Sequence, residues 1–367
     1  MKHKKIIIAG GTGFIGQAMA RYFGKDNHVI ILSRQSANGH NNKYSDHLLK
    51  SADGYNITYW RWDGQHIEKH WAQEFEGVDV VINLAGKSVN CRYNEKNKQQ
   101  IINSRTKATQ IIGEAIRHTT VPPKLWINAS SATIYHHETN KPNSEAAGII
   151  SEWKSDNMPY SLLDRVRYRC KKWITAIRFG KKSNRYQNID KDFSVNVCRQ
   201  WEHTFFEQRT PFTRKIALRT AITLGTGGVM VPYFNLLKFG LGGRQGKGRQ
   251  MYSWIHEEDL CRIVDWCYEH KEMEGVYNCV APNAVTNDNF METLRRITGH
   301  KIGAPAFTAM LEAGAALIGT ETELILKSRW VYPEKLLQTG FRFAYNKIEE
   351  ALTDIVRKVP RRKYHLF

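Results

Sequence analysis

The chain has 367 residues, of which 41% are hydrophobic and 24% charged, so it can bury a large core as one extended domain or two. A membrane span is not expected, because the best apolar run, 313–318, is far shorter than the ~20 residues that a span needs. The basic residues 1–5 lead into a short apolar run and then a glycine turn, which predicts a first strand rather than a signal peptide and favours a cytoplasmic protein.

The net charge of +19 is unevenly distributed along the chain. Segment 153–192 carries eleven Lys or Arg against four Asp or Glu, and residues 357–363 add five more positive charges. Since the excess lies in one segment and one tail rather than in a recognition motif, it argues against a nucleic-acid partner and favours a solvated loop and a frayed end. The six cysteines form no Cys-x-x-Cys pair, so neither a metal site nor a disulfide framework is expected.

Apolar, β-branched runs alternate with helical patterns through the first two thirds of the chain. The predicted strands are 5–9, 29–33, 57–62, 78–84, 125–129 and 216–224, and the predicted helices are 14–23, 95–118 and 193–208. Strands buried on both faces read as such continuous apolar runs, and their alternation with helices predicts an α/β fold with a doubly wound parallel sheet. Beyond Gly225, glycine turns separate shorter elements, and 301–367 reads as mostly helical.

Three glycines with the spacing G-x-x-G-x-x-G follow the first predicted strand and open the first predicted helix. In such a turn the first glycine allows the tight bend, the second lets backbone approach a pyrophosphate, and the third lets helix and strand pack closely. The free N–H groups of the helix start favour phosphate. The predicted cofactor-binding residues of this turn are Gly10, Thr12, Gly13, Phe14, Ile15 and Gly16.

The end of the second predicted strand indicates which dinucleotide the turn binds. NAD-binding sites usually place Asp or Glu there to hold the ribose 2′-hydroxyl, whereas this chain has Ser33 and Arg34. The guanidinium fork of Arg34 suits a 2′-phosphate, and Ser33 adds a hydroxyl. The sequence therefore predicts NADP, with a plain surface arginine after a strand as the alternative.

Two more strand ends fit the same cofactor. Leu84, Ala85 and Gly86 follow the fourth predicted strand, where small residues let adenosine and ribose approach. Asp63 follows the third strand, where a carboxylate can accept a hydrogen bond from the adenine amine. Ordinary turn chemistry is the alternative at either position.

With these residues in place, the chain resembles the short-chain dehydrogenase/reductase superfamily, and most of all an atypical extended branch, an epimerase-like family with a distinct C-terminal domain. The stretches that carry the resemblance are 10–16, 83–86, 103–105, 129–135, 197–202, 218–219, 224–228, 254–256, 328–336 and 340–341. The resemblance implies NADP binding, with contacts from Leu84, Ala85 and Arg105. We assign Ala129 and Ser130, at the end of the fifth strand, to the same cofactor.

The resemblance also suggests a division of the chain. It implies an NADP-binding Rossmann domain over 1–300 and a smaller, mostly helical C-terminal substrate domain over 301–367. Within the first domain, 153–192 reads as a basic insertion, and 225–250 is expected to contribute to the substrate cleft. Assembly as a homodimer is a further expectation.

The catalytic pattern departs from that of the superfamily, whose chemistry rests on a Ser that holds the substrate oxygen and a Tyr-x-x-x-Lys pair that moves the proton. Ser131 stands after the fifth predicted strand, where the Ser belongs. Near the expected distance, however, Tyr160 is followed four residues later by Asp164, and a later match at 168–172 falls inside the basic segment. The helix expected to carry the pair, 193–208, has no tyrosine.

Tyr135, four residues beyond Ser131, is the best remaining proton handler, and packing beside the cofactor is its alternative role. The substrate side is assigned to Arg219, which ends the sixth strand and can grip an anion, and to Trp254 and His256 across the cleft. His256 also precedes an acidic first helical turn and fits a helix cap.

The sequence thus predicts an NADP-dependent oxidoreductase or epimerase that acts on a small-molecule substrate. A second hypothesis is an NADP(H)-binding redox sensor whose chemistry has lapsed, which the missing Tyr-x-x-x-Lys pair favours. A third is nucleic-acid association through 153–192 and the basic tail, which predicts a steep salt dependence of binding.

Overall fold

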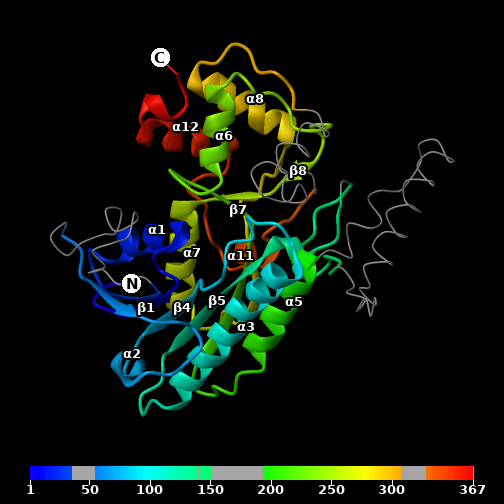
Figure 1. Cartoon of the computed structure of the whole chain (residues 1–367). Coiled ribbons are helices and arrows are strands. Elements are labelled where there is room, and N and C mark those ends of the chain that lie inside the picture. Colours follow the sequence, from blue (N-terminus) through cyan, green and yellow to red (C-terminus); the bar gives the residue numbers. More distant parts are fainter. Residues whose placement is uncertain (35–53, 139, 151–192, 307–327, 367) are drawn as a thin grey trace.

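A seven-stranded, all-parallel sheet forms the centre of the molecule, with strand order β10-β6-β5-β4-β1-β2-β3 (Figure 1). The computed structural model describes residues 1–34, 54–138, 140–150, 193–306 and 328–366. The strands of this sheet are β1 Lys5–Ala9, β2 His28–Ser33, β3 Ile57–Arg61, β4 Val80–Asn83, β5 Leu125–Ser131, β6 Arg214–Thr220 and β10 Gly275–Cys279. The order places β1 between β2 and β4. From β1 the chain adds β2 and β3 on one side, and it then crosses over to add β4, β5, β6 and β10 on the other, as in Rossmann folds. The predicted fold class is confirmed.

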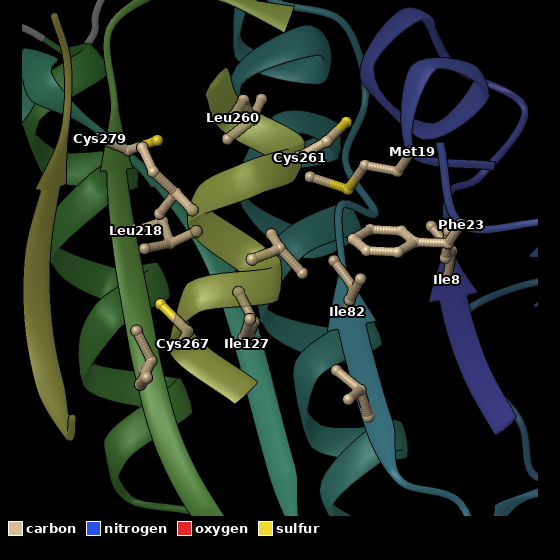
Figure 2. Close-up of a cluster of buried hydrophobic side chains, with 14 of the residues drawn as sticks. Ile8, Met19, Phe23, Ile82, Ile127, Leu218, Leu260, Cys261, Cys267 and Cys279 are labelled. Carbon is tan, nitrogen blue, oxygen red and sulfur yellow. The ribbon is translucent and has the colours of Figure 1, made fainter. Parts of the chain in front are cut away.

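Helices cover both faces of the sheet because its strands are apolar on both sides. Ile6 and Ile8 of β1 belong to one hydrophobic core with residues of α1 (Phe14–Phe23) and α7 (Glu257–Glu269). Figure 2 shows Ile8 beside Phe23 of α1, with Leu260 of α7 in the same cluster. The alternate residues of β1 face the other layer. That layer comprises α2 (Lys69–Ala72), η3 (Gln73–Phe75), α3 (Glu95–Arg117) and α5 (Phe193–Phe206). The two-residue alternation of a strand thus divides one apolar run between two cores.

The predicted strand 216–224 is wrong as a single element. It breaks at Ala221 into β6, which belongs to the main sheet, and β7 (Ile222–Leu224), which pairs with β9 (Trp254–His256) in a separate two-stranded sheet. The Ala221 N–H still donates to the Cys279 carbonyl, whereas the next N–H, of Ile222, donates to Ser253. A change of hydrogen-bond partner therefore divides a run that is continuous in hydrophobicity.

A second hydrophobic core lies beyond the carboxyl edge of the sheet. Its helices are α6 (Met230–Lys238), α8 (Asn287–Thr298) and α12 (Ile348–Lys358), and they stand together above the sheet in Figure 1. By contrast Leu336 of α11 (Glu334–Gln338) and Phe341 pack into the core between the sheet and α7. The predicted domain boundary at residue 300 stays a prediction. The core between the sheet and α7 and the second core each contain residues from before and after this position.

The remaining short elements connect these layers. They are η4 (Ala132–Ile134), β8 (Met251–Tyr252), β11 (Val285–Thr286) and η6 (Arg361–Lys363). The basic segment 153–192, including Tyr160 and the match at 168–172, lies outside the described residues. Within the described part of the chain, no helix combines the length and apolar character that crossing a membrane requires.

We expect Gly16→Ala to destabilise the fold by about 1–3 kcal/mol, the usual cost of overpacking. A Cβ at Gly16 would lie closest to the Cα of Gly11 and 2.6 Å from its carbonyl carbon, and this backbone cannot swing away. Gly13→Ala is the matched control, because its Cβ would meet nothing nearer than the Gly10 carbonyl oxygen at 3.5 Å. Urea unfolding of both variants measures the difference, and equal midpoints would contradict the packing argument.

Candidate functional site

The glycine turn lies against the loop that follows β4. Gly10 has φ +78°, a left-handed conformation that favours glycine. A Cβ there would also lie 3.0 Å from the carbonyl carbon of Leu84 and from the nitrogen of Ala85. The Leu84 N–H donates to the Ala9 carbonyl at 2.9 Å, which continues the pairing of β1 with β4 up to the turn. Two of the predicted cofactor segments therefore meet at the carboxyl edge of the sheet.

The same turn is joined to the end of β2. The hydroxyls of Thr12 and Ser33 are 2.9 Å apart, and Gln17 of α1 donates to the Gly11 carbonyl at 2.8 Å. Ser33 is buried, whereas Arg34 directly after it is exposed, and none of the ion pairs found among the described residues involves Arg34. Ser33 and Arg34, on which the prediction of NADP rests, therefore follow each other beside the turn, and the Ser33 hydroxyl faces it.

Phe14 and Ile15 open α1 and face different neighbours. Ile15 packs on the core between the sheet and α7. The Phe14 ring lies against the glycine loop after β7, where a Cβ on Gly227 or Gly228 would meet the ring at 3.2 or 2.7 Å. This contact brings the start of the predicted 225–250 cleft segment onto the glycine turn.

Asn83, at the end of β4, fixes the loop that carries Leu84 and Ala85. Its buried carboxamide donates to Asn128 at 2.7 Å and to Thr109 at 3.0 Å, and it accepts from the Ala85 N–H at 3.1 Å. All polar atoms of this side chain thus serve the protein itself. Asn83 therefore positions the loop rather than facing a ligand.

Arg105 on α3 supports the next residues of that loop. Its guanidinium donates to the Lys87 carbonyl at 3.1 Å and lies 5.0 Å from the ring of Trp201 on α5. A Cβ on Gly86 would lie 3.0 Å from the guanidinium carbon, so Gly86 leaves the space that this side chain fills. Burial lowers the pKa of Arg105. The implied cofactor contact of Arg105 stays a prediction, and its contacts within the protein give it a supporting role.

Asp63 stands apart from these contacts. Its carboxylate accepts from the backbone N–H groups of Gln65 and His66 at 2.7 and 3.0 Å, and the His66 ring nitrogen lies 2.6 Å from its other oxygen. This is the turn chemistry that the sequence offered as the alternative to adenine binding. Since Asp63 remains exposed, the adenine role also stays a prediction.

The ends of β5, β6 and β10 carry a chain of buried polar groups. Ser130 donates to Glu202 at 2.5 Å, and Glu202 receives two further bonds, at 2.9 and 2.8 Å, from the fork of Arg219. The third nitrogen of Arg219 donates to the Tyr135 hydroxyl at 2.9 Å, and that hydroxyl donates to Asn278 at 2.9 Å. Burial opposes the charge of Arg219, but the bonds to Glu202 outweigh it and raise the arginine pKa.

This chain of bonds bears on two predicted roles. Arg219, assigned to an anionic substrate, uses all three guanidinium nitrogens within the protein. Tyr135, the candidate proton handler, is only 1% exposed, and burial raises its pKa despite Arg219. A tyrosine that gives and takes protons near neutral pH needs the opposite shift. Ser131 is half-buried, and its hydroxyl accepts from the Thr133 N–H at 3.2 Å.

From the sequence, α5 is the helix expected to carry the Tyr-x-x-x-Lys pair of the superfamily. Its sequence has no tyrosine, and Cys198, the only thiol on it, is buried with a pKa raised by burial to about 12. This thiol is therefore protonated and inert near neutral pH. The helix instead contributes Glu202 to the bonds described above and the ring of Trp201 that lies against Arg105.

Trp254 and His256 lie on β9, outside the main sheet. Trp254 is fully buried in the second core, and its indole N–H donates to the Asn283 carbonyl at 3.0 Å. His256 caps α7, accepting from the Glu258 N–H at 3.2 Å, and its other ring nitrogen lies 3.2 Å from Asp354. The capping alternative is confirmed for His256, and the substrate roles of both residues stay predictions.

Sequence reasoning missed the residues that hold the site together. Glu202 accepts hydrogen bonds from Arg219, and Asn278 accepts one from Tyr135. Asn128 and Thr109 likewise hold the side chain of Asn83 in place. The only signal for Glu202 was its place in the stretch 197–202. No sequence pattern marks Glu202 as buried, because its partner Arg219 lies seventeen positions away and only the fold places the two side by side.

A parallel α/β sheet with a dinucleotide-type glycine turn at its carboxyl edge defines the Rossmann class of nucleotide-binding proteins. The family model for the NAD-dependent epimerase/dehydratase family matches residues 6–170, and the model for a domain of unknown function, DUF1731, matches residues 306–355. The chain is thus similar to the NAD-dependent epimerase/dehydratase family over the sheet-forming part of the molecule and to the DUF1731 domain in its C-terminal part.

Known relatives match over almost their whole length. The epimerase family protein SSP1921 of Staphylococcus saprophyticus is 29% identical over 360 residues, covering 97% of this chain and 100% of the relative. The epimerase family protein SDR39U1 of Mus musculus is 28% identical over 363 residues, covering 96% and 99%. Both matches therefore extend over the sheet-forming part of this chain and over its C-terminal part.

Solved structures with the same fold include an epimerase family protein and a sugar-nucleotide epimerase. The crystal structure of human SDR39U1 with NADPH has a TM-score of 0.71 at 23% identity, covering 96% of this chain and 99% of that one. The UDP-N-acetylglucosamine 4-epimerase of Bacillus cereus has a TM-score of 0.64 at 17% identity, covering 96% and 98%. At these identities the likeness establishes the fold.

We expect Arg219→Ala to cost about 3–5 kcal/mol of stability, because it leaves the buried Glu202 without its counterion. The double variant Arg219→Met with Glu202→Leu is the control, since it removes both charges and keeps apolar volume. It should lose less stability than Arg219→Ala alone. Chemical denaturation measures both, and a double variant less stable than the single one would contradict the ion-pair account.

Burial lowers the pKa of His256, with Asp354 opposing and Lys358 reinforcing the shift. The unfolded chain therefore binds more protons than the folded one below the usual histidine pKa near 6.5. The stability that neutral His256 contributes is present above that pH and is lost as the pH falls through and below it. We expect His256→Asn, which keeps a capping side chain, to reduce this loss between pH 7.5 and 5.5. Urea unfolding at both pH values measures it, and an unchanged loss would assign the pH dependence to other groups.

Proposed function

We propose that this protein is an NADP-dependent oxidoreductase or epimerase of the atypical extended short-chain dehydrogenase/reductase type, acting on a small-molecule substrate. The observation that carries the proposal is the contact of Thr12 in the glycine turn with Ser33 at the end of β2, followed by the exposed Arg34. No acid stands at this strand end to hold an unphosphorylated ribose. The NADPH in the human SDR39U1 structure agrees with the choice.

The residues of the turn fit a dinucleotide. Gly13 stands just before α1 with open space at its Cβ position, apart from the Gly10 carbonyl oxygen at 3.5 Å. The missing side chain of Gly13 therefore leaves room for a pyrophosphate to approach the N–H groups at the start of α1. In this reading the turn holds the pyrophosphate, Ser33 and Arg34 hold the 2′-phosphate, and Leu84, Ala85 and Gly86 border the adenosine half.

The reactive half of the cofactor falls near the end of β5, where Ala129, Ser130 and Ser131 lie. Bound NADP supplies hydride chemistry there. Ser131, half-buried at the strand end, is the group that orients a substrate oxygen. Tyr135 is proposed to keep that strand end in place through Arg219, since its hydroxyl is already engaged on both sides.

The engaged Tyr135 and the absence of a tyrosine on α5 favour a second candidate function. In it, the protein binds NADP(H) without turnover and reports the redox state through a change in partner binding. The two candidates share the cofactor site and differ in whether Ser131 acts on a substrate.

We expect the protein to bind NADPH at least tenfold more tightly than NADH, and Arg34→Ala to remove most of that preference. The reason is that a charge-assisted arginine–phosphate bond contributes about 1.5–3 kcal/mol. Titration calorimetry with both cofactors measures it. Equal affinities of the unaltered protein for NADPH and NADH would overturn the cofactor assignment.

The same preparation separates the two candidate functions. Net NADPH oxidation with carbonyl compounds, or conversion of a sugar nucleotide to its epimer by the NADP⁺-loaded protein with no net cofactor change, supports the enzyme if Ser131→Ala abolishes it. Tight NADPH binding with no turnover across the panel supports the sensor.

A further inference from the structure

A second arginine stands beside the residues proposed to hold the 2′-phosphate. Arg61 is the last residue of β3, which is parallel to β2 and forms the edge of the seven-stranded sheet. In the register of the two strands, Arg61 is paired with Ser33. Sequence reasoning assigned Arg61 no role, because nothing in the chain order places it next to the end of β2.

The register determines the face from which the Arg61 side chain leaves the sheet. Residues paired across neighbouring strands project from the same face, and successive residues alternate. Trp60 and Trp62, on either side of Arg61, pack into the core on the α3 face. Arg61 therefore leaves from the opposite face, as does its partner Ser33, whose hydroxyl is 2.9 Å from Thr12.

The backbone of Arg61 is held in this place on both sides. Its carbonyl accepts from the His70 ring at 3.1 Å, and the N–H of Trp62 donates to the Ser33 carbonyl at 2.8 Å. Neighbouring strands lie only about 4.8 Å apart, well within the length of an arginine side chain. The guanidinium can therefore reach the space above Ser33.

The charges at the ends of β2 and β3 favour the binding of an anion. Arg34 and Arg61 are both exposed, and neither takes part in an ion pair within the described parts of the chain. The nearest acid in the sequence, Asp63, is bonded to His66 and to its own turn. A phosphate monoester carries up to two negative charges, so one arginine leaves it incompletely neutralised and two arginines do not.

We propose that Arg61 is a specificity-determining residue that binds the 2′-phosphate of NADP together with Arg34. The proposal rests on the proposed NADP dependence and extends it to a residue on a third strand. Its competitor is a charge that only keeps the exposed edge strand β3 from pairing with another chain. Such a charge contributes to solubility and does not distinguish between cofactors.

The test compares Arg61→Ala with Lys69→Ala, a matched control that removes another exposed cation eight residues away, at the start of α2. Kd values for NADPH and NADH are measured by calorimetry on the full chain, after thermal melting has confirmed that both variants are folded. We expect Arg61→Ala to raise the Kd for NADPH about tenfold or more and to leave that for NADH within twofold. Lys69→Ala should change neither.

The outcomes separate this proposal from the one it rests on. If the unaltered protein prefers NADPH, Arg34→Ala removes the preference and Arg61→Ala leaves it intact, only the role of Arg61 is overturned. If the unaltered protein binds both cofactors equally, the NADP assignment fails and the role of Arg61 fails with it. An equal loss of both cofactors in Arg61→Ala also overturns the proposal, since it would assign Arg61 to general binding.

Discussion

The close approach of two backbones at the carboxyl edge of the sheet sets the geometry of the whole site. The turn at Gly10 touches the chain at Leu84 and Ala85 with no side chain between them. Because β1 and β4 are adjacent and parallel, their following loops must share this space, and only a residue without a Cβ fits at the point of contact. The Thr12–Ser33 contact and the bonds of Asn83 then hold the neighbouring loops against the same point.

Further along the same edge, the buried polar side chains at the ends of β5, β6 and β10 form hydrogen bonds with one another. Glu202, Arg219, Tyr135 and Asn278 form one buried chain, in which each group satisfies the next. Burying an unpaired charge costs several kcal/mol, so these groups are present as a connected set. The result is a firm support for the ends of β5, β6 and β10. The same set of bonds explains why Tyr135 and Arg219, which the sequence assigned to catalysis and substrate binding, are buried.

The second core ties the C-terminal part of the chain to this edge. His256 joins the start of α7 to Asp354 of α12, while Phe14 of the glycine turn lies under the loop that leads into α6. The cofactor turn and the C-terminal helices thus share neighbours. A substrate cleft built from both parts would have its walls positioned by the same contacts that hold the core.

The sequence by itself predicted the strands and helices that surround the glycine turn, and it predicted a dinucleotide-type site there. Continuous apolar strands and the spacing of Gly10, Gly13 and Gly16 are local properties, and α1 has the bounds that its pattern predicts. The tertiary structure alone decided which polar residues meet. Glu202 with Arg219, and Arg61 with Ser33, are neighbours only because parallel strands and a packed helix bring distant positions to one edge. The break at Ala221 has the same origin, since hydrophobicity records burial but not which strand accepts the hydrogen bonds.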